Sequence, residues 1–393
     1  MSSTHSPAAD VAATVAAQTA AGRERWLERL ERLVRIDSGR DAPAGRESVA
    51  GLLAEWAAGA GCAVELVPGH GGSTLVARLD GSGGPRVALL GHHDTVHPAG
   101  TAHRAGFSVD GSRALGPGVA DMKGGLVLAL EAIEVLAAGD RPFGSVELTS
   151  VPDEETRPHG AFDTLDRVVG AGACLVLECA RQNGDLVVAR KAQATFSVVA
   201  RGRSAHAGTH PERGRSAILA LCREALRWDE LNGARPGLTV TAGTFHAGTH
   251  FASVPDHARI DGDIRAWDDA HVSWALDRIG AAPTADGVSF ELSSLSRWPA
   301  MAPNAASLRL LDAAEELGRR LGTPVGRRRT GGSSDGCWTA AAGVPTLDGL
   351  GPIGGHDHSP DEYIDLDSWP ARCALLVGLI TSVSETCVGE THD

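Results

Sequence analysis

Histidine and carboxylate side chains stand at the ends of several apolar segments, where they could act together on a metal ion. His92 and Asp94 directly follow the apolar run 86–91. Four carboxylates hold similar places beside an apolar strand or helix, namely Asp121, Glu154, Glu155 and Glu178. A further histidine, His358, lies far along the chain in "GGHDHSPDEYID". Each group alone could be a solvated loop residue, a helix N-cap or a charged turn, so their shared position is what indicates a site.

The residue types predict a binuclear metal centre. Histidine and carboxylate ligands without thiolate suit zinc, cobalt or manganese. The candidates exceed what one tetrahedral zinc ion needs, which indicates two ions that share a bridging carboxylate. Two divalent ions and three ligand carboxylates would leave about one net positive charge, which favours a bridging hydroxide, the nucleophile of a metal-dependent hydrolase.

The segments that position these side chains predict an α/β fold. Short apolar runs indicate strands, and longer amphipathic or alanine-rich runs indicate helices. The expected strands are 63–68, 74–79, 86–91, 144–151 and 173–178, and the expected helices are 23–37, 47–61 and 122–138. Continuous apolar strands alternating with helices are typical of a largely parallel sheet with helices on both faces. The functional crevice of such a sheet lies beyond the carboxyl ends of its strands, where the candidate ligands stand.

A second pattern begins near residue 192. Residues 192–298 read strand, helix, strand, strand, helix, strand, which is the ferredoxin-like βαββαβ unit. Helices at 304–322 and 368–385 then resume the first pattern. We therefore expect a catalytic domain formed by 16–191 and 299–393, with a lid or dimerisation domain of residues 192–298 inserted into it.

Composition limits the partners. The chain has 393 residues and a net charge of −13, which disfavours nucleic acid and anionic membranes as partners. Its seven cysteines are scattered and odd in number, so a reducing cytoplasm fits better than a disulfide framework. No Lys or Arg precedes Arg23, so we expect no signal or transit peptide, and residues 1 to about 15 are expected to form a disordered or fraying tail.

Seven short segments give the chain a specific resemblance. In order they are "GHHDTV", "GPGVADMKGG", "DEE", "LVLE", "GRSAHAG", "GGSSD" and "HSPDEYI". The chain thereby resembles, over nearly its whole length, the dizinc exopeptidase family of bacterial glutamate carboxypeptidase, aminoacylase, peptidase T, acetylornithine deacetylase and succinyl-diaminopimelate desuccinylase. It is most similar to the glutamate carboxypeptidase branch.

The resemblance implies a ligand set for two divalent ions, zinc first, with cobalt or manganese possible. His92 and Glu178 would bind one ion, and Glu155 and His358 would bind the other. Asp121 would bridge the two ions.

The resemblance also implies the remaining roles. Asp94 would orient the first histidine ligand, and Glu154 would be the general base. His206 would reach from the lid of a partner subunit to stabilise the oxyanion. Arg265 would hold a substrate carboxylate, and the loop containing Gly332 would border the substrate pocket.

Other histidines are expected to be bystanders. His93 occupies a variable position of the motif, and His97 and His103 are expected at the surface. His356 is a near neighbour that could compete with His358 for the ligand role.

One position departs from the relatives. Ala252 stands where the family usually has an asparagine whose amide lies beside the substrate carboxylate. His250 would share a strand face with Ala252 and could replace that amide.

The expected function is therefore zinc-dependent hydrolysis of the amide bond of N-acyl or peptidyl amino acids with a free carboxylate. C-terminal glutamate is the first candidate, and the enzyme would be a homodimer joined through the lid. Two alternatives stay open: an aminoacylase- or desuccinylase-type deacylase, and a catalytically inactive metal-binding or interaction protein. The presence of Glu154 beside all five expected ligands disfavours the inactive alternative.

Overall fold

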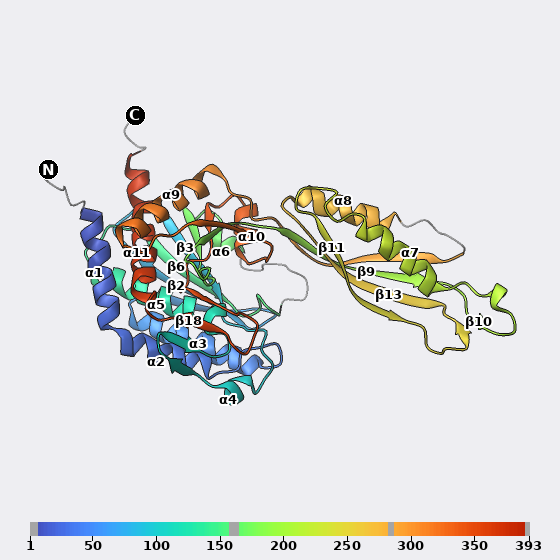
Figure 1. Cartoon of the computed structure of the whole chain (residues 1–393). Coiled ribbons are helices and arrows are strands. Elements are labelled where there is room, and N and C mark those ends of the chain that lie inside the picture. The colour runs from blue at the N-terminus through green and yellow to red at the C-terminus, as the bar shows by residue number, and fades with distance from the viewer. Residues whose placement is uncertain (1–6, 157–164, 282–286, 390–393) are drawn as a thin grey trace.

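The computed structural model of the chain describes residues 7–156, 165–281 and 287–389, arranged as a main body and a long projecting arm (Figure 1). Among these residues, no helix has the length and apolar character needed to cross a bilayer.

A six-stranded sheet forms the centre of the main body. Its strand order is β1-β2-β6-β3-β7-β16. The strands are β1 (Ala63–Pro68), β2 (Ser73–Asp80), β3 (Arg86–His92), β6 (Ser145–Val151), β7 (Ala173–Val176) and β16 (Thr346–Leu347). The pairs β6-β3, β3-β7 and β7-β16 are parallel, and β1 and β2 add an antiparallel edge. The predicted, largely parallel sheet is thus confirmed.

Helices cover both faces of this sheet, because its central strands are apolar on both sides. Along β3, Val87 and Leu89 face the larger core, whereas Ala88 and Leu90 face a smaller one. The larger core is built with α2 (Arg23–Val34), α3 (Pro43–Gly59), α5 (Gly124–Ala138), α9 (Ala305–Arg320) and α11 (Trp369–Gly389). The smaller core lies against α6 (Leu165–Val168) and α10 (Gly336–Ala341).

The expectation of a disordered tail up to about residue 15 is wrong from residue 7 onward. The helix α1 (Pro7–Ala21) runs alongside α11, and Val15 is fully buried there (Figure 1). Alanine supplies high helix propensity without a broad apolar stripe, which is why periodicity gave no signal. Residues 1–6 lie outside the described part of the chain.

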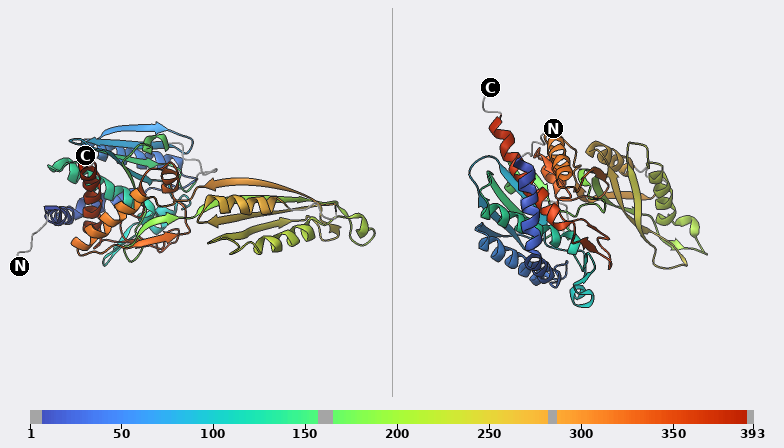
Figure 2. Two further views of the ribbon diagram at one scale, coloured as in Figure 1. Left: turned by 90° about the horizontal axis from the view of Figure 1, so that it is seen from above. Right: turned by 60° about the vertical axis from the view of Figure 1, so that its left-hand side comes forward.

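The projecting arm is the predicted βαββαβ unit. Its elements are β9 (Ala192–Arg201), α7 (Ala217–Asp229), β11 (Thr239–Ala247), β13 (His257–Ala266), α8 (Asp269–Gly280) and β14 (Ser289–Trp298). The four strands are antiparallel in the order β11-β13-β9-β14, with α7 and α8 packed against β9 and β13 (Figure 2). Two short strands, β10 (Ala205–His206) and β12 (Ser253–Val254), pair at the end far from the main body (Figure 1).

Short strands complete the main body around the candidate site. β8 (Leu186–Arg190) pairs in parallel with β15 (Arg327–Thr330). A small sheet has the order β17-β18-β5-β4 and is formed by β17 (Gly354–Gly355), β18 (Tyr363–Asp365), β5 (Arg113–Leu115) and β4 (Ser108–Asp110). The sequence did not predict these strands, because runs of two to five residues carry little periodicity.

Candidate metal centre

The candidate ligands converge beyond the carboxyl ends of the central parallel strands. His92 is the last residue of β3, and Glu178 follows β7 by two residues. Glu155 follows β6, and Asp121 lies in the turn that leads into α5. Segments that are distant in sequence therefore bring their polar groups to one edge of the sheet.

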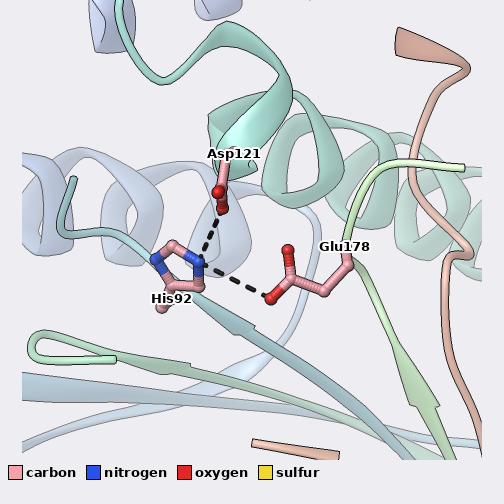
Figure 3. Close-up of side chains that lie close together, drawn as sticks. All are labelled: His92, Asp121 and Glu178. Carbon is pink, nitrogen blue, oxygen red and sulfur yellow. Dashed lines mark hydrogen bonds and ion pairs between the residues drawn. The ribbon is translucent and has the colours of Figure 1, made fainter. Parts of the chain in front are cut away.

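One group of ligand atoms gathers around His92. Its Nε2 lies 3.0 Å from Oδ1 of Asp121 and 3.7 Å from Oε1 of Glu178 (Figure 3). The imidazole is almost fully buried, so it points into the cluster rather than into solvent.

A second group gathers around His358. Its Nε2 lies 3.0 Å from Oδ2 of Asp121 and 2.8 Å from Oε1 of Glu155. The structure brings His358 to these carboxylates, whereas the ring of His356 packs against Tyr363.

The two groups share one residue. Within each group, every ligand atom lies within 4.8 Å of the others, and Asp121 contributes to both. Its two carboxylate oxygens face different histidines, Oδ1 toward His92 and Oδ2 toward His358. A donor set of one histidine and two carboxylates per group suits zinc or a similar divalent ion. A third, overlapping group joins His92 to Glu154 and Glu155.

Asp94 performs two structural tasks at once. Its backbone carbonyl and its Oδ1 lie 3.1 Å and 3.3 Å from Nδ1 of His92, which directs the other ring nitrogen toward Asp121. The same buried carboxylate accepts backbone N–H groups of Glu154, Glu155 and Thr156 at 3.0–3.1 Å. It therefore fixes a histidine and the acidic loop in one arrangement.

Glu362 holds the loop that carries Asp121. Its buried carboxylate accepts the N–H groups of Gly118, Ala120 and Asp121 at 2.8–2.9 Å. Nε2 of His97 also lies 3.0 Å from this carboxylate.

The expectation that His97 is a surface histidine is therefore wrong. Its side chain is only 14% exposed, because the ring is held against Glu362. His103, by contrast, is exposed as expected.

The charges of the cluster explain why a cation fits it. Burial, with help from neighbouring carboxylates, raises the pKa of Glu154 and Glu178 well above their ordinary range, and burial also raises the pKa of Glu155. Hydrogen bonds to Asp121 and Glu155 raise the pKa of His358 to about 11. Divalent ions would supply the positive charge that these crowded carboxylates otherwise take from protons.

His93 is a structural neighbour rather than a ligand. It is fully buried, and its Nδ1 lies 2.9 Å from Oγ of Ser150. Burial lowers its pKa to about 3, which keeps the ring neutral. Cys179 is buried as expected for a small apolar residue, and burial raises the pKa of its thiol. The cysteines whose side chains are described are free thiols, namely Cys62, Cys174, Cys179, Cys222, Cys337 and Cys373.

A pocket of about 240 Å³ lies over the cluster. Its wall includes Asp121, Glu154, Glu155, Glu178 and His358, together with Gly332 and Ser333 of the "GGSSD" loop. The buried Arg190 holds this loop, because its guanidinium donates to the carbonyl of Gly332 at 3.1 Å and to the Asp348 carboxylate at 2.6 Å.

The helix that follows this loop does not offer a free anion site at its N-terminus. α10 has six residues, and the N–H of Gly336 already donates to Oγ of Ser334 at 3.2 Å.

Arg265 lies next to this loop, not in the pocket wall. It donates to the Gly331 carbonyl at 2.7 Å and to Asp263 at 2.9 Å. A substrate carboxylate would compete with these two partners for its guanidinium.

His206 and His250 lie at the far end of the arm, away from the metal cluster of the same chain (Figure 1). Nδ1 of His206 accepts the N–H groups of Gly208 and Thr209, both at 3.1 Å. His250 lies in a turn beside Ala252 rather than on a strand, so the argument from a shared strand face is wrong. Chain reversal at this point removes the alternation on which that argument depended.

Comparisons with known proteins show a matching family model, related sequences and a similar solved structure. Peptidase family M20/M25/M40 matches residues 88–382. Carboxypeptidase G2 of Pseudomonas sp. (strain RS-16) is 26% identical over 368 residues, which cover 90% of this chain and 88% of that protein. Succinyl-diaminopimelate desuccinylase of Alkalilimnicola ehrlichii is 30% identical over 313 residues, which cover 73% of this chain and 82% of that enzyme. The structure of aminopeptidase PepT from Bacillus cereus aligns with a TM-score of 0.75 at 25% identity, over 92% of this chain and 98% of that one.

Proposed function

The chain belongs to peptidase family M20/M25/M40 and is a hydrolase of amide bonds, and from this premise we propose that it is a binuclear metallohydrolase. Its proposed substrates are N-acyl or peptidyl amino acids with a free carboxylate. The observation that carries the proposal is the position of Asp121 between two groups of ligand atoms.

The ligand assignment follows the two groups. His92, Asp121 and Glu178 would hold one divalent ion, and Asp121, Glu155 and His358 the other. Two such ions, zinc first, would polarise the scissile carbonyl and lower the pKa of the attacking water.

Glu154 is the proposed general base. It lines the pocket and belongs to neither of the two groups that share Asp121, so this ligand assignment leaves its carboxylate for proton transfer. Burial raises its pKa, which suits a group that takes a proton from water and gives it to the leaving amine near neutral pH. The Asp94 carboxylate fixes its backbone in place.

His206 is proposed to act in the site of a second subunit. Its distance from its own cluster disfavours a role there, and its ring is already oriented by Gly208 and Thr209. The arm offers a surface for a homodimer: β11 is an edge strand that is mostly exposed, and Leu219 and Leu226 of α7 are 59% and 71% exposed.

Arg265 is the proposed partner of the substrate carboxylate. A substrate carboxylate would carry a charge opposite to that of the guanidinium, so its contact with Arg265 would be stronger than the bond to the neutral Gly331 carbonyl. The similarity to carboxypeptidase G2 favours a C-terminal amino acid, glutamate first, as the residue released. The similarity to a desuccinylase supports the second candidate, a deacylase that releases an acyl group from an amine.

The test compares one good substrate with its α-carboxamide, in the parent enzyme and in Arg265→Ala. We expect amidation to lower kcat/KM in the parent by more than about tenfold, roughly 1.4 kcal/mol, and by less in Arg265→Ala. Arg259→Ala is the matched control, because Arg259 lies on the same strand and pairs with Asp261. A decrease of less than tenfold in the parent would mean that the enzyme recognises the acyl side of the substrate and is a deacylase or amidase.

A further inference from the structure

A second hollow of about 420 Å³ adjoins the pocket over the metal cluster. The two hollows share Cys179, Arg181 and Asp357 in their walls. The second hollow is therefore a neighbour of the pocket in which the amide of a substrate would lie.

Arg181 stands in the wall between the two hollows with unused hydrogen-bonding capacity. Its Nε is buried, and it has no hydrogen-bond partner in the described part of the chain. The other arginine of the metal pocket, Arg190, differs in this respect, because Asp348 and two loop carbonyls engage it. The Arg181 side chain lines both hollows, so a carboxylate bound in the second hollow could make a charge-assisted contact with the accessible part of its guanidinium.

The rest of the second hollow is cationic and polar. Arg328 lines it, and the guanidinium is exposed and only loosely paired, with 3.9 Å to the Asp185 carboxylate. Asp357 is the carboxylate among its lining residues, so two guanidinium groups face one acid. Gly354 and Gly355 also line it, and a side chain at Gly355 would meet Gln182 of the same lining. Such a hollow suits a short chain that ends in a carboxylate.

We propose that the second hollow receives the acyl side of the substrate, and that Arg181, assisted by Arg328, selects acyl groups that carry a carboxylate. This proposal rests on the proposed function, which assigns the other end of the substrate to the side of Arg265. Arg181 is thus a specificity-determining residue that acts at the end of the substrate opposite to the released amino acid.

Two kinds of acyl group provide this chemistry: a dicarboxylic monoacyl group, and an acidic N-terminal residue of a dipeptide. The test therefore uses two matched pairs on the same amino acid, N-succinyl with N-succinamoyl, and α-glutamyl with α-glutaminyl. Each pair replaces one carboxylate by an isosteric amide. We expect kcat/KM of the fully metallated parent enzyme to be at least tenfold higher for the acid in one of the two pairs.

The variants locate the preference. In Arg181→Met, which keeps an unbranched apolar side chain, the acid-to-amide ratio should fall toward one, and Arg328→Met should lower it less. Arg327→Met is the control, because Arg327 on the same strand as Arg328 is paired with Asp312 and Glu315, away from both hollows. Competitive inhibition by succinate relative to succinamate gives a binding readout that should change in parallel.

The outcomes separate this inference from the function on which it rests. A ratio below about threefold in the parent for both pairs, or a ratio that Arg181→Met leaves unchanged, overturns the role of Arg181. The parent ratio tests the preference for a carboxylate even if Arg181→Met does not fold, and an unchanged ratio in Arg328→Met would then count against the assignment to the second hollow. Failure to hydrolyse any N-acyl or peptidyl amino acid would instead overturn the proposed function.

Discussion

At the scale of single residues, the candidate site depends on how one carboxylate is presented. Asp121 offers one oxygen to each histidine group, and it can do so only because its loop is fixed. Glu362 supplies that constraint through three backbone N–H groups. Asp121, which would bridge the two ions, is therefore positioned by Glu362, which belongs to neither group of ligand atoms.

Asp121→Ala should lose both ions, because the variant removes a carboxylate from both groups at once. Glu178→Ala and His358→Ala each alter one group only, so each should weaken binding of a single ion. Elemental analysis of the purified variants measures this directly. A metal content of about two per chain in Asp121→Ala would rule out the shared carboxylate.

Glu154→Gln should keep its metal and lose turnover. The amide preserves the shape of the side chain and removes its basicity, which lowers kcat by roughly 10²- to 10⁴-fold. Metal analysis and steady-state kinetics on the same preparation provide the two readouts. Loss of metal instead would show that Glu154 and Glu155 have exchanged roles.

The sequence predicts the residues whose position follows from local pattern. His92 and Glu178 stand at the carboxyl ends of apolar strands, and that place, shared with the other candidates, suggested them. Glu362 and Arg181 were not predicted to act, because their roles depend on contacts with segments that lie far away in sequence. The "HSPDEYI" motif contained Glu362, and a carboxylate in such a motif that is buried in the fold is the signal that could have identified it.

At the scale of elements, the loop before α5, which carries Asp121, is hydrogen-bonded to the segment before β18 through Glu362. Glu362→Gln would leave one oxygen as acceptor and place an NH₂ group against backbone N–H donors. We expect metal affinity to fall by about 10- to 100-fold, as for other residues that orient metal ligands.

The matched control for this variant is Asp361→Asn, because the neighbouring side chain is exposed. Competition with a chelator gives metal affinity, and circular dichroism shows whether the fold is retained. Unchanged affinity in a folded Glu362→Gln would mean that the loop needs no such support.

The elements that the sequence missed share a physical reason. The central strands are apolar on both faces and were found from composition, whereas β8, β15, β17 and β18 are short and take their shape from their neighbours. The helix α1 lacks a strong apolar stripe, so only its packing against α11 reveals it. Local pattern thus predicts the framework of the sheet, while tertiary contacts decide the short strands around the site.

At the scale of the whole molecule, the shape separates groups that the proposed mechanism needs together. The arm carries His206 to its far end, while the metal cluster lies in the main body (Figure 1). One face of the arm's sheet is covered by α7 and α8, and the residues of β11 are largely exposed along the free edge. A second copy of the chain, paired through this arm, is the arrangement that would complete each site.

Mixed dimers test this arrangement. His206→Ala and Glu154→Gln chains should each be nearly inactive alone, because every site in such a homodimer lacks one group. In a mixed dimer, one site combines a native Glu154 from the first chain with a native His206 from the second, so that site should work, and the other site lacks both. Co-expression with two different affinity tags isolates the mixed dimer, and its kcat/KM per dimer should approach half that of the parent.

An isolated mixed dimer as inactive as the two single-variant homodimers would show that His206 does not act across subunits. A monomeric parent with full activity would contradict the shared site altogether.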